Sequence, residues 1–227
     1  MSCTANNLTE FLMTEQEKRK SRSEKILTDL GSDFIPYLPL IEFKADAKIR
    51  TPREIGLRIL CLFGVAAASH GVDSSIIIEW LKRESVFSSL SREEKTYLQK
   101  NDKSENENFQ FSWRSECIWL LLWAIGKVQR DLPTAQCNVD EMLQVLPSLN
   151  GSTEKFLESI ELRSTKEILD QSDLIYRAHW AIRQYGLDES VRIGNLDPDV
   201  VMEWHLAINW LTNYGETDYW DEVTTDT

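Results

Sequence analysis

Apolar residues recur along most of the chain at intervals of three and four, which is typical of amphipathic helices, and strand-like alternation is rare. Several segments begin with a capping box, in which Ser or Thr is followed three residues later by Glu, as at 51–54, 91–94 and 164–167. The pattern predicts helices that begin near residues 51, 91, 164 (ending near 186) and 197 (ending near 215), and further helices over about 14–30, 74–84, 113–130, 139–146 and 153–162.

One stretch, residues 34–48, interrupts the helical pattern. Pro36 and Pro39 are incompatible with a helix interior, and the alternation over 41–44 suits one short edge strand at most. We therefore expect an extended, Pro-containing connector between the first two helices.

Residues 100–108 contain no apolar side chain and predict an exposed loop. This loop could separate two sub-layers, 1–99 and 109–227, within a single helical domain of residues 1–227. Together these patterns predict an all-α orthogonal bundle of about eight or nine helices. Its central helices are expected at 113–130, 164–185 and 198–214.

The chain is acidic, with 25 Lys and Arg against 37 Asp and Glu and a net charge of −12. Residues 188–227 contain ten acids and a single base, Arg192, a local balance of −9. This charge argues against binding to nucleic acids or anionic membranes and suits a basic protein partner better. For the acidic end itself, a role in solubility is favoured over a surface that docks such a partner electrostatically.

The chain is expected in the cytoplasm. No signal-peptide pattern begins the sequence, and the longest apolar runs, 59–68 and 118–126, are shorter than the ~20 residues that cross a bilayer. The cysteines are far apart, without a CxxC pair, and predict free thiols in a reducing compartment. They are Cys3, Cys61, Cys117 and Cys137.

Distinctive motifs, several of them containing Trp, follow one another in the second half of the chain. They lie at 113–126, 162–170, 173–181, 203–211 and 220–227. Together with residues 50–58, they resemble the largely bacterial family known as domain of unknown function 4272 (DUF4272). The resemblance covers essentially the whole chain and implies one domain and one fold, but no activity. The sequence departs from the family pattern at Trp204, where a polar or basic residue is expected.

Familiar catalytic motifs are absent from the sequence, and its three histidines form no paired-His metal motif. Glu167, Asp170 and Asp173 recur at intervals of three on one predicted helix, and carboxylates spaced in this way could hold Mg²⁺ in a hydrolase of a phosphorylated small molecule. Arg177 lies four residues after Asp173, however, so an intrahelical ion pair is the favoured interpretation. We therefore expect no metal and no cofactor.

Charged residues also lie on helix faces that are otherwise apolar. Glu116 and Glu203 are surrounded by Trp, Leu and Ala at helical spacing, and Arg58 is flanked by apolar residues in the same way. Because a lone buried charge is costly, we expect a buried charge network of Glu116 and Glu203 with Arg58, Arg163 or Arg177, or raised Glu pKa values. Any functional site should lie beside it.

A second candidate polar site involves two helices. His205 and Asn209 are one turn apart, and Arg183 near His179 would lower the pKa of that histidine. Structural hydrogen bonding is favoured over a general base for these histidines. The candidate residues are Asp170, Asp173, His179, His205 and Asn209.

Two functional hypotheses follow from the sequence. The leading one is a non-enzymatic interaction protein, for example of the inhibitor or immunity type, that presents an acidic surface to a basic partner. The alternative is the metal-dependent hydrolase that uses Glu167, Asp170 and Asp173. Paired carboxylates and an exposed acidic patch would favour the first, whereas carboxylates converging in a pocket would favour the second.

Overall fold

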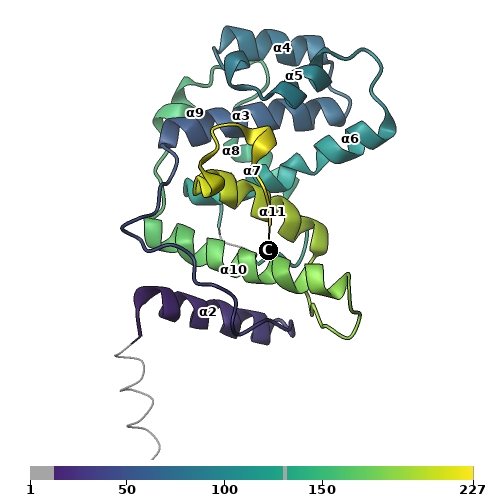
Figure 1. The fold of residues 1–227 in the computed structure, drawn as a ribbon. Coiled ribbons are helices and arrows are strands. Elements are labelled where there is room, and N and C mark those ends of the chain that lie inside the picture. Colours follow the sequence, from purple (N-terminus) through teal and green to yellow (C-terminus); the bar gives the residue numbers. More distant parts are fainter. Residues whose placement is uncertain (1–12, 130–131, 227) are drawn as a thin grey trace, which may run out of the picture.

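The computed structural model describes residues 13–129 and 132–226 (Figure 1). Over these residues the chain forms helices and no β-strand, which confirms the predicted all-α class. The α-helices are α2 (Glu15–Asp29), α3 (Pro52–Ser69), α4 (Ser74–Arg83), α5 (Arg92–Gln99), α6 (Glu105–Ser112), α7 (Arg114–Ala124), α8 (Val139–Val145), α9 (Glu154–Glu158), α10 (Thr165–Tyr185) and α11 (Pro198–Leu211).

Every predicted helical segment contains a helix, and the predicted capping boxes form at the starts of α3, α5 and α10. The predicted loop at 100–108 is wrong in its second half, because α6 begins at Glu105. Ser104 and Glu107 form a further capping box there, with the Glu107 N–H 3.2 Å from the Ser104 hydroxyl oxygen. Helix α7 ends at Ala124, six residues earlier than predicted, and Gly126 follows with a φ of +71°.

The main hydrophobic core lies where α3 and α11 pack against α7. Helix α10 lies between α11 and α2, and a smaller apolar cluster that includes Leu27 and Leu174 fills the α2–α10 contact. Helices from both sides of residues 100–108 therefore pack into the same core rather than into the sub-layers 1–99 and 109–227. None of the described helices combines the length and apolar composition that a membrane crossing requires.

The connector at residues 34–48 has no regular secondary structure, and the short edge strand considered for 41–44 does not form. Side chains of the neighbouring helices bind its backbone carbonyls instead. Arg19 of α2 donates to the Glu42 carbonyl at 2.9 Å, and Arg177 of α10 donates to the Pro39 carbonyl at 3.1 Å. The connector is therefore held in place by buried guanidinium groups rather than by a ladder of backbone hydrogen bonds.

After α11 the chain turns back on itself, and the tail, residues 217–226, runs across α11 toward α3 and α5 (Figure 1). The turn uses positive φ angles at Asn213, Gly215 and Glu216. Arg50 fixes it by donating to the carbonyl of Trp210 at 3.2 Å and to the Asn213 side-chain oxygen at 2.8 Å. The same arginine also binds the carbonyl of Thr217. One buried side chain thus caps α11 and positions the tail.

Candidate functional site

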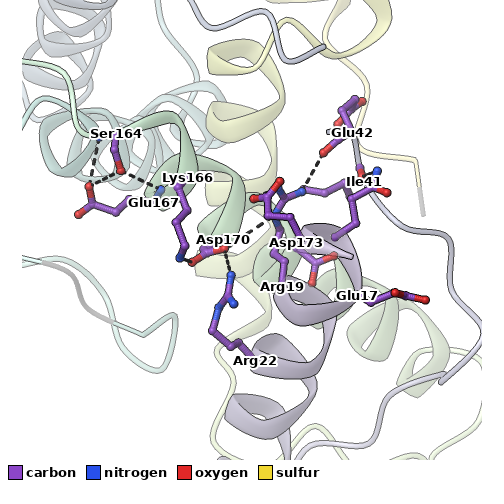
Figure 2. A network of polar contacts seen from close by, with 12 residues as sticks. Glu17, Arg19, Arg22, Ile41, Glu42, Ser164, Lys166, Glu167, Asp170 and Asp173 are labelled. Atoms are coloured by element: carbon purple, nitrogen blue, oxygen red, sulfur yellow. Dashed lines mark hydrogen bonds and ion pairs between the residues drawn. The ribbon is translucent and has the colours of Figure 1, made fainter. Parts of the chain in front are cut away.

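The acidic face of α10 meets α2 in a cluster of ion pairs (Figure 2). Asp170 binds Arg22 of α2 and Lys166, whose Nζ lies 2.8 Å away. Burial raises the pKa of Asp170, but the hydrogen bonds from Lys166 and Arg22 outweigh it and leave the pKa below its usual value. The Glu167 carboxylate accepts hydrogen bonds from the backbone N–H and hydroxyl of Ser164, which lower its pKa.

The third carboxylate of the predicted metal set, Asp173, is almost fully buried and forms a two-point ion pair with Arg177. Both N···O distances are 2.9 Å. This is the intrahelical pair that the spacing favoured. Over the described residues, no group of three or more His, Cys, Asp or Glu side chains is arranged to hold a metal ion.

The single buried charge network predicted from the sequence is wrong, because the charges pair separately. Arg58 is 5% exposed and pairs with Glu94 of α5, which is 2% exposed. The Arg58 guanidinium also lies 4.9 Å from the ring centroid of Trp220 in the tail. Glu94 was recognised from the sequence only as a capping residue.

Glu203 pairs with Arg114 rather than with Arg58, Arg163 or Arg177, at 2.8 Å. Both side chains are about one-fifth exposed, so this pair lies at the edge of the core.

Glu116 is buried and has no arginine partner among the described residues. It accepts hydrogen bonds from the Cys137 backbone N–H at 2.8 Å and from the Trp204 indole N–H at 3.1 Å. Burial outweighs these bonds and raises its pKa, which is the second outcome anticipated for an unpaired glutamate.

Arg163 closes the end of α7. Its Nε donates to the Trp123 carbonyl at 2.7 Å and its Nη2 to the Val128 carbonyl at 3.3 Å. The guanidinium also lies 5.3 Å from the centroid of the Trp123 ring. Its role is therefore to satisfy carbonyl groups that have no partner within the helix.

Two histidines meet between α10 and α11. Nδ1 of His179 lies 2.6 Å from Nδ1 of His205, and the side chains are 1% and 2% exposed. Because Nε2 of His179 is buried and has no partner among the described residues, we assign the shared proton to Nδ1 of His179, which leaves no N–H of that ring unpaired. Burial and the nearby Arg183 lower the pKa of His179 to about 4, and burial and His179 lower that of His205 to about 3.

The rest of the candidate polar site is dispersed. Asn209 donates to the Thr224 carbonyl at 2.8 Å and so helps to hold the tail. Asp170 faces α2, and the Asp173–Arg177 pair lies against the connector. Of the five residues predicted for this site, only His179 and His205 form a hydrogen bond with each other.

A cavity of about 1370 Å³ lies elsewhere, between α3, α5, α6 and the tail. Sequence reasoning did not predict it, because the tail folds back through tertiary contacts, such as those of Arg50 and Asn209, that join residues far apart in the chain. Two buried arginines form part of its wall, each beside a tryptophan. Among the residues that line it are Arg50, Arg58, Glu93, Trp210, Trp220 and Asp221.

A family model described as domain of unknown function (DUF4272) matches residues 19–223 of the 227-residue chain. No curated protein matches the chain. No solved structure matches it either.

Proposed function

The chain belongs to the DUF4272 family, whose description gives no activity, and we propose from its own residues that it is a non-enzymatic interaction protein of the inhibitor or immunity type. In this proposal its acidic C-terminal quarter, residues 188–226, docks a basic protein partner.

The observation that carries the proposal is a contrast between two sets of carboxylates. Those of α10 are held by cations or capping groups of the same chain. In the C-terminal quarter, only three of the ten acids form ion pairs within the described residues: Glu203, Glu216 and Asp218. Eight of the ten are exposed, so most of this charge faces solvent without a partner cation from the described part of the chain. Such a surface attracts basic proteins and accelerates their association.

The hydrolase alternative would need Glu167, Asp170 and Asp173 to be free for Mg²⁺. A metal would have to displace Lys166 and Arg22 from Asp170, and Arg177 from Asp173. The cavity also lies apart from these carboxylates, because none of them lines it. These contacts support the interaction protein over the hydrolase.

We also propose a cytoplasmic location. Cys61, Cys117 and Cys137 carry free thiols, and burial raises the pKa of each, as suits cysteines that serve as small apolar side chains in a reducing compartment. Cys3 lies outside the described residues.

Affinity capture from the native host tests the proposal. The acids to neutralise as Asn or Gln are Asp188, Glu189, Asp199, Asp221, Glu222 and Asp226. A matched control neutralises six exposed acids elsewhere: Glu79, Asp102, Glu105, Asp140, Glu154 and Glu158. A basic protein retained by the wild type and the control, but lost from the first variant, is the expected result. Capture of a partner that is not basic, or equal loss from both variants, would refute the proposal.

A further inference from the structure

We propose that the cavity between α5, α6 and the tail is the place where the partner docks, and that it takes an extended, arginine-bearing segment of that protein. This inference rests on the proposed function and adds to it a location and a ligand class. Three features of the cavity support it: the charge of its rim, the aromatic wall, and an unpaired donor in a buried arginine.

The rim carries carboxylates without partner cations. Glu93, Asp221 and Glu222 line the cavity, are exposed, and form no ion pair within the described residues. They are held in position, because the Asp221 carboxylate accepts from the Glu93 backbone N–H at 3.0 Å and Thr217 donates its hydroxyl to Glu222 at 3.1 Å. Of the described residues that line the cavity, the only exposed cation is Arg92. The rim therefore favours a cationic ligand.

The wall of the cavity already accommodates guanidinium groups. Arg50 lies 5.2 Å from the centroid of the Trp210 ring and pairs with Asp218. Arg58 lies over the ring of Trp220 in the same way and pairs with the carboxylate of Glu94. An aromatic ring combined with a carboxylate is thus the local environment in which this protein holds arginine.

Tyr219 offers the same combination at the rim. Its side chain is 69% exposed, it lines the cavity, and it directly precedes Trp220 and Asp221. A guanidinium from a partner could stack on this ring and bind the neighbouring carboxylates with its fork of N–H groups. Lysine lacks the planar group that such stacking uses, so arginine is the favoured residue.

A buried arginine at the cavity supplies the complementary group for a polypeptide. Arg58 lines the cavity and is 5% exposed, and its Nε–H has no acceptor among the described residues. Because Nε is shielded from solvent, a backbone carbonyl of a docked segment accepts this hydrogen bond only when the wall around Arg58 opens. A peptide bearing arginine brings both a cation for the rim and an acceptor for Arg58.

An anionic ligand is disfavoured because carboxylates of this chain already bind the cations and backbone N–H groups that such a ligand would use. Asp218 binds Arg50, Glu94 binds Arg58, and Asp221 accepts from the first turn of α5. Lys95, which also lines the cavity, donates to the carbonyl of Ser88 at 3.3 Å.

Binding of a capped peptide of alternating Gly and Arg to the full chain tests the proposal, with Lys and Glu counterparts as comparisons. Intrinsic fluorescence, to which Trp210 and Trp220 contribute, reports on binding, and the Nε–H resonance of Arg58 reports on the proposed hydrogen bond. We expect the Arg peptide to bind about threefold more tightly than the Lys peptide, and Tyr219→Leu to abolish this preference. The Arg58 resonance should shift on binding.

Two variants locate the site. The first variant neutralises the rim with Glu93→Gln, Asp221→Asn and Glu222→Gln. It should weaken the binding of the Arg peptide by about tenfold or more. Asn and Gln keep the acceptor oxygens, so the tail should stay in place. The control set Asp140→Asn, Glu154→Gln and Glu158→Gln should change the affinity less than about twofold.

The proposed docking site would be overturned by any of three results. These are an equal loss of Arg-peptide affinity in the rim set and the control set, an Arg58 Nε–H resonance that does not shift, and a Glu peptide that binds more tightly than the Arg peptide. If binding of the captured partner requires Asp188, Glu189 and Asp199 but is unaffected by the neutralised rim, the proposed function is retained and only the proposed docking site is wrong. If no basic protein is captured and no Arg peptide binds, both fall.

Discussion

Buried and half-buried arginines connect the irregular parts of this protein to its helices. Arg50 binds the end of α11 and the tail, Arg163 binds the end of α7, and Arg19 and Arg177 bind the connector. Each donates N–H groups of its planar guanidinium to backbone carbonyls at helix ends or in segments without regular structure. Arg50 and Arg163, like Arg58, also lie over an indole ring, which gives part of the high tryptophan content a structural role.

The buried Arg58–Glu94 ion pair should contribute far more to the free energy of unfolding than the exposed residues next to Glu94 on α5. Glu94→Ala leaves the Arg58 guanidinium buried without its counter-ion, and we expect a loss of about 3 to 5 kcal/mol in the free energy of unfolding. The adjacent, exposed Glu93→Ala should stay within about 0.5 kcal/mol. Urea melts of the two variants provide the measurement, and similar midpoints would mean that the pair contributes little.

Glu203→Ala provides a graded comparison in the same melts. Because Glu203 and Arg114 are each about one-fifth exposed, water can solvate the arginine that remains, and the loss should be smaller, about 1 to 2 kcal/mol.

The histidine pair predicts a loss of stability in mild acid. The folded-state pKa values of His179 and His205 are about 4 and about 3, whereas an unfolded histidine titrates near pH 6.5. Below pH 6.5 the unfolded chain therefore binds more protons, so the stability contributed by the neutral pair is complete above that pH and falls as the pH drops toward 4.

Urea melts at pH 7.5 and 5.5 measure this effect before most carboxylates titrate. We expect a loss of about 1 to 2 kcal/mol per histidine over this interval. A His179→Phe, His205→Leu variant should show a much smaller difference between the two pH values. The exposed His70→Gln variant is the control and should behave like the wild type; a wild-type stability that does not change with pH would contradict the assignment.

At the scale of elements, helix starts could be predicted from the sequence because a capping box is local. The spacing of Ser or Thr to Glu predicted the starts at Thr51 and Ser164 correctly, and the same rule applied to Ser104 would have found α6. Ion-pair partners could not be predicted in this way. Glu94 is 36 residues from Arg58, and Arg114 is 89 residues from Glu203, so these pairs depend on how the helices pack.

The contact between α2 and α10 explains why the α10 carboxylates should not bind a divalent metal. Asp170 is held by Arg22 and Lys166, and Arg19 approaches it at 3.7 Å, so a metal would meet a cationic environment. Calorimetric titration with Mg²⁺ or Mn²⁺ should show no binding at micromolar concentration. Tight binding that disappears in Asp170→Asn would contradict this and favour the hydrolase.

At the scale of the whole molecule, acids that are paired with cations and acids that are not lie in different regions. The net charge is −12, and residues 188–227 account for −9 of it, whereas the acids at the α2–α10 contact are neutralised by neighbouring cations. The field outside the protein therefore comes mainly from the C-terminal quarter. A field of this kind acts on partners before contact, and salt shortens its range to about 10 Å at 0.1 M.

The rate at which the captured partner associates should therefore fall steeply as salt is added, by about tenfold or more between roughly 0.02 and 0.5 M. The dissociation rate should change much less, because the contacts within the complex are short and partly shielded from solvent. Stopped-flow fluorescence measures both rates. Neutralising Asp188, Glu189 and Asp199 should flatten the salt dependence of association, since these exposed acids contribute to the field without lining the cavity. Association that proceeds equally fast at low and high salt would show that the acidic surface does not steer the partner, and would leave solubility as its role.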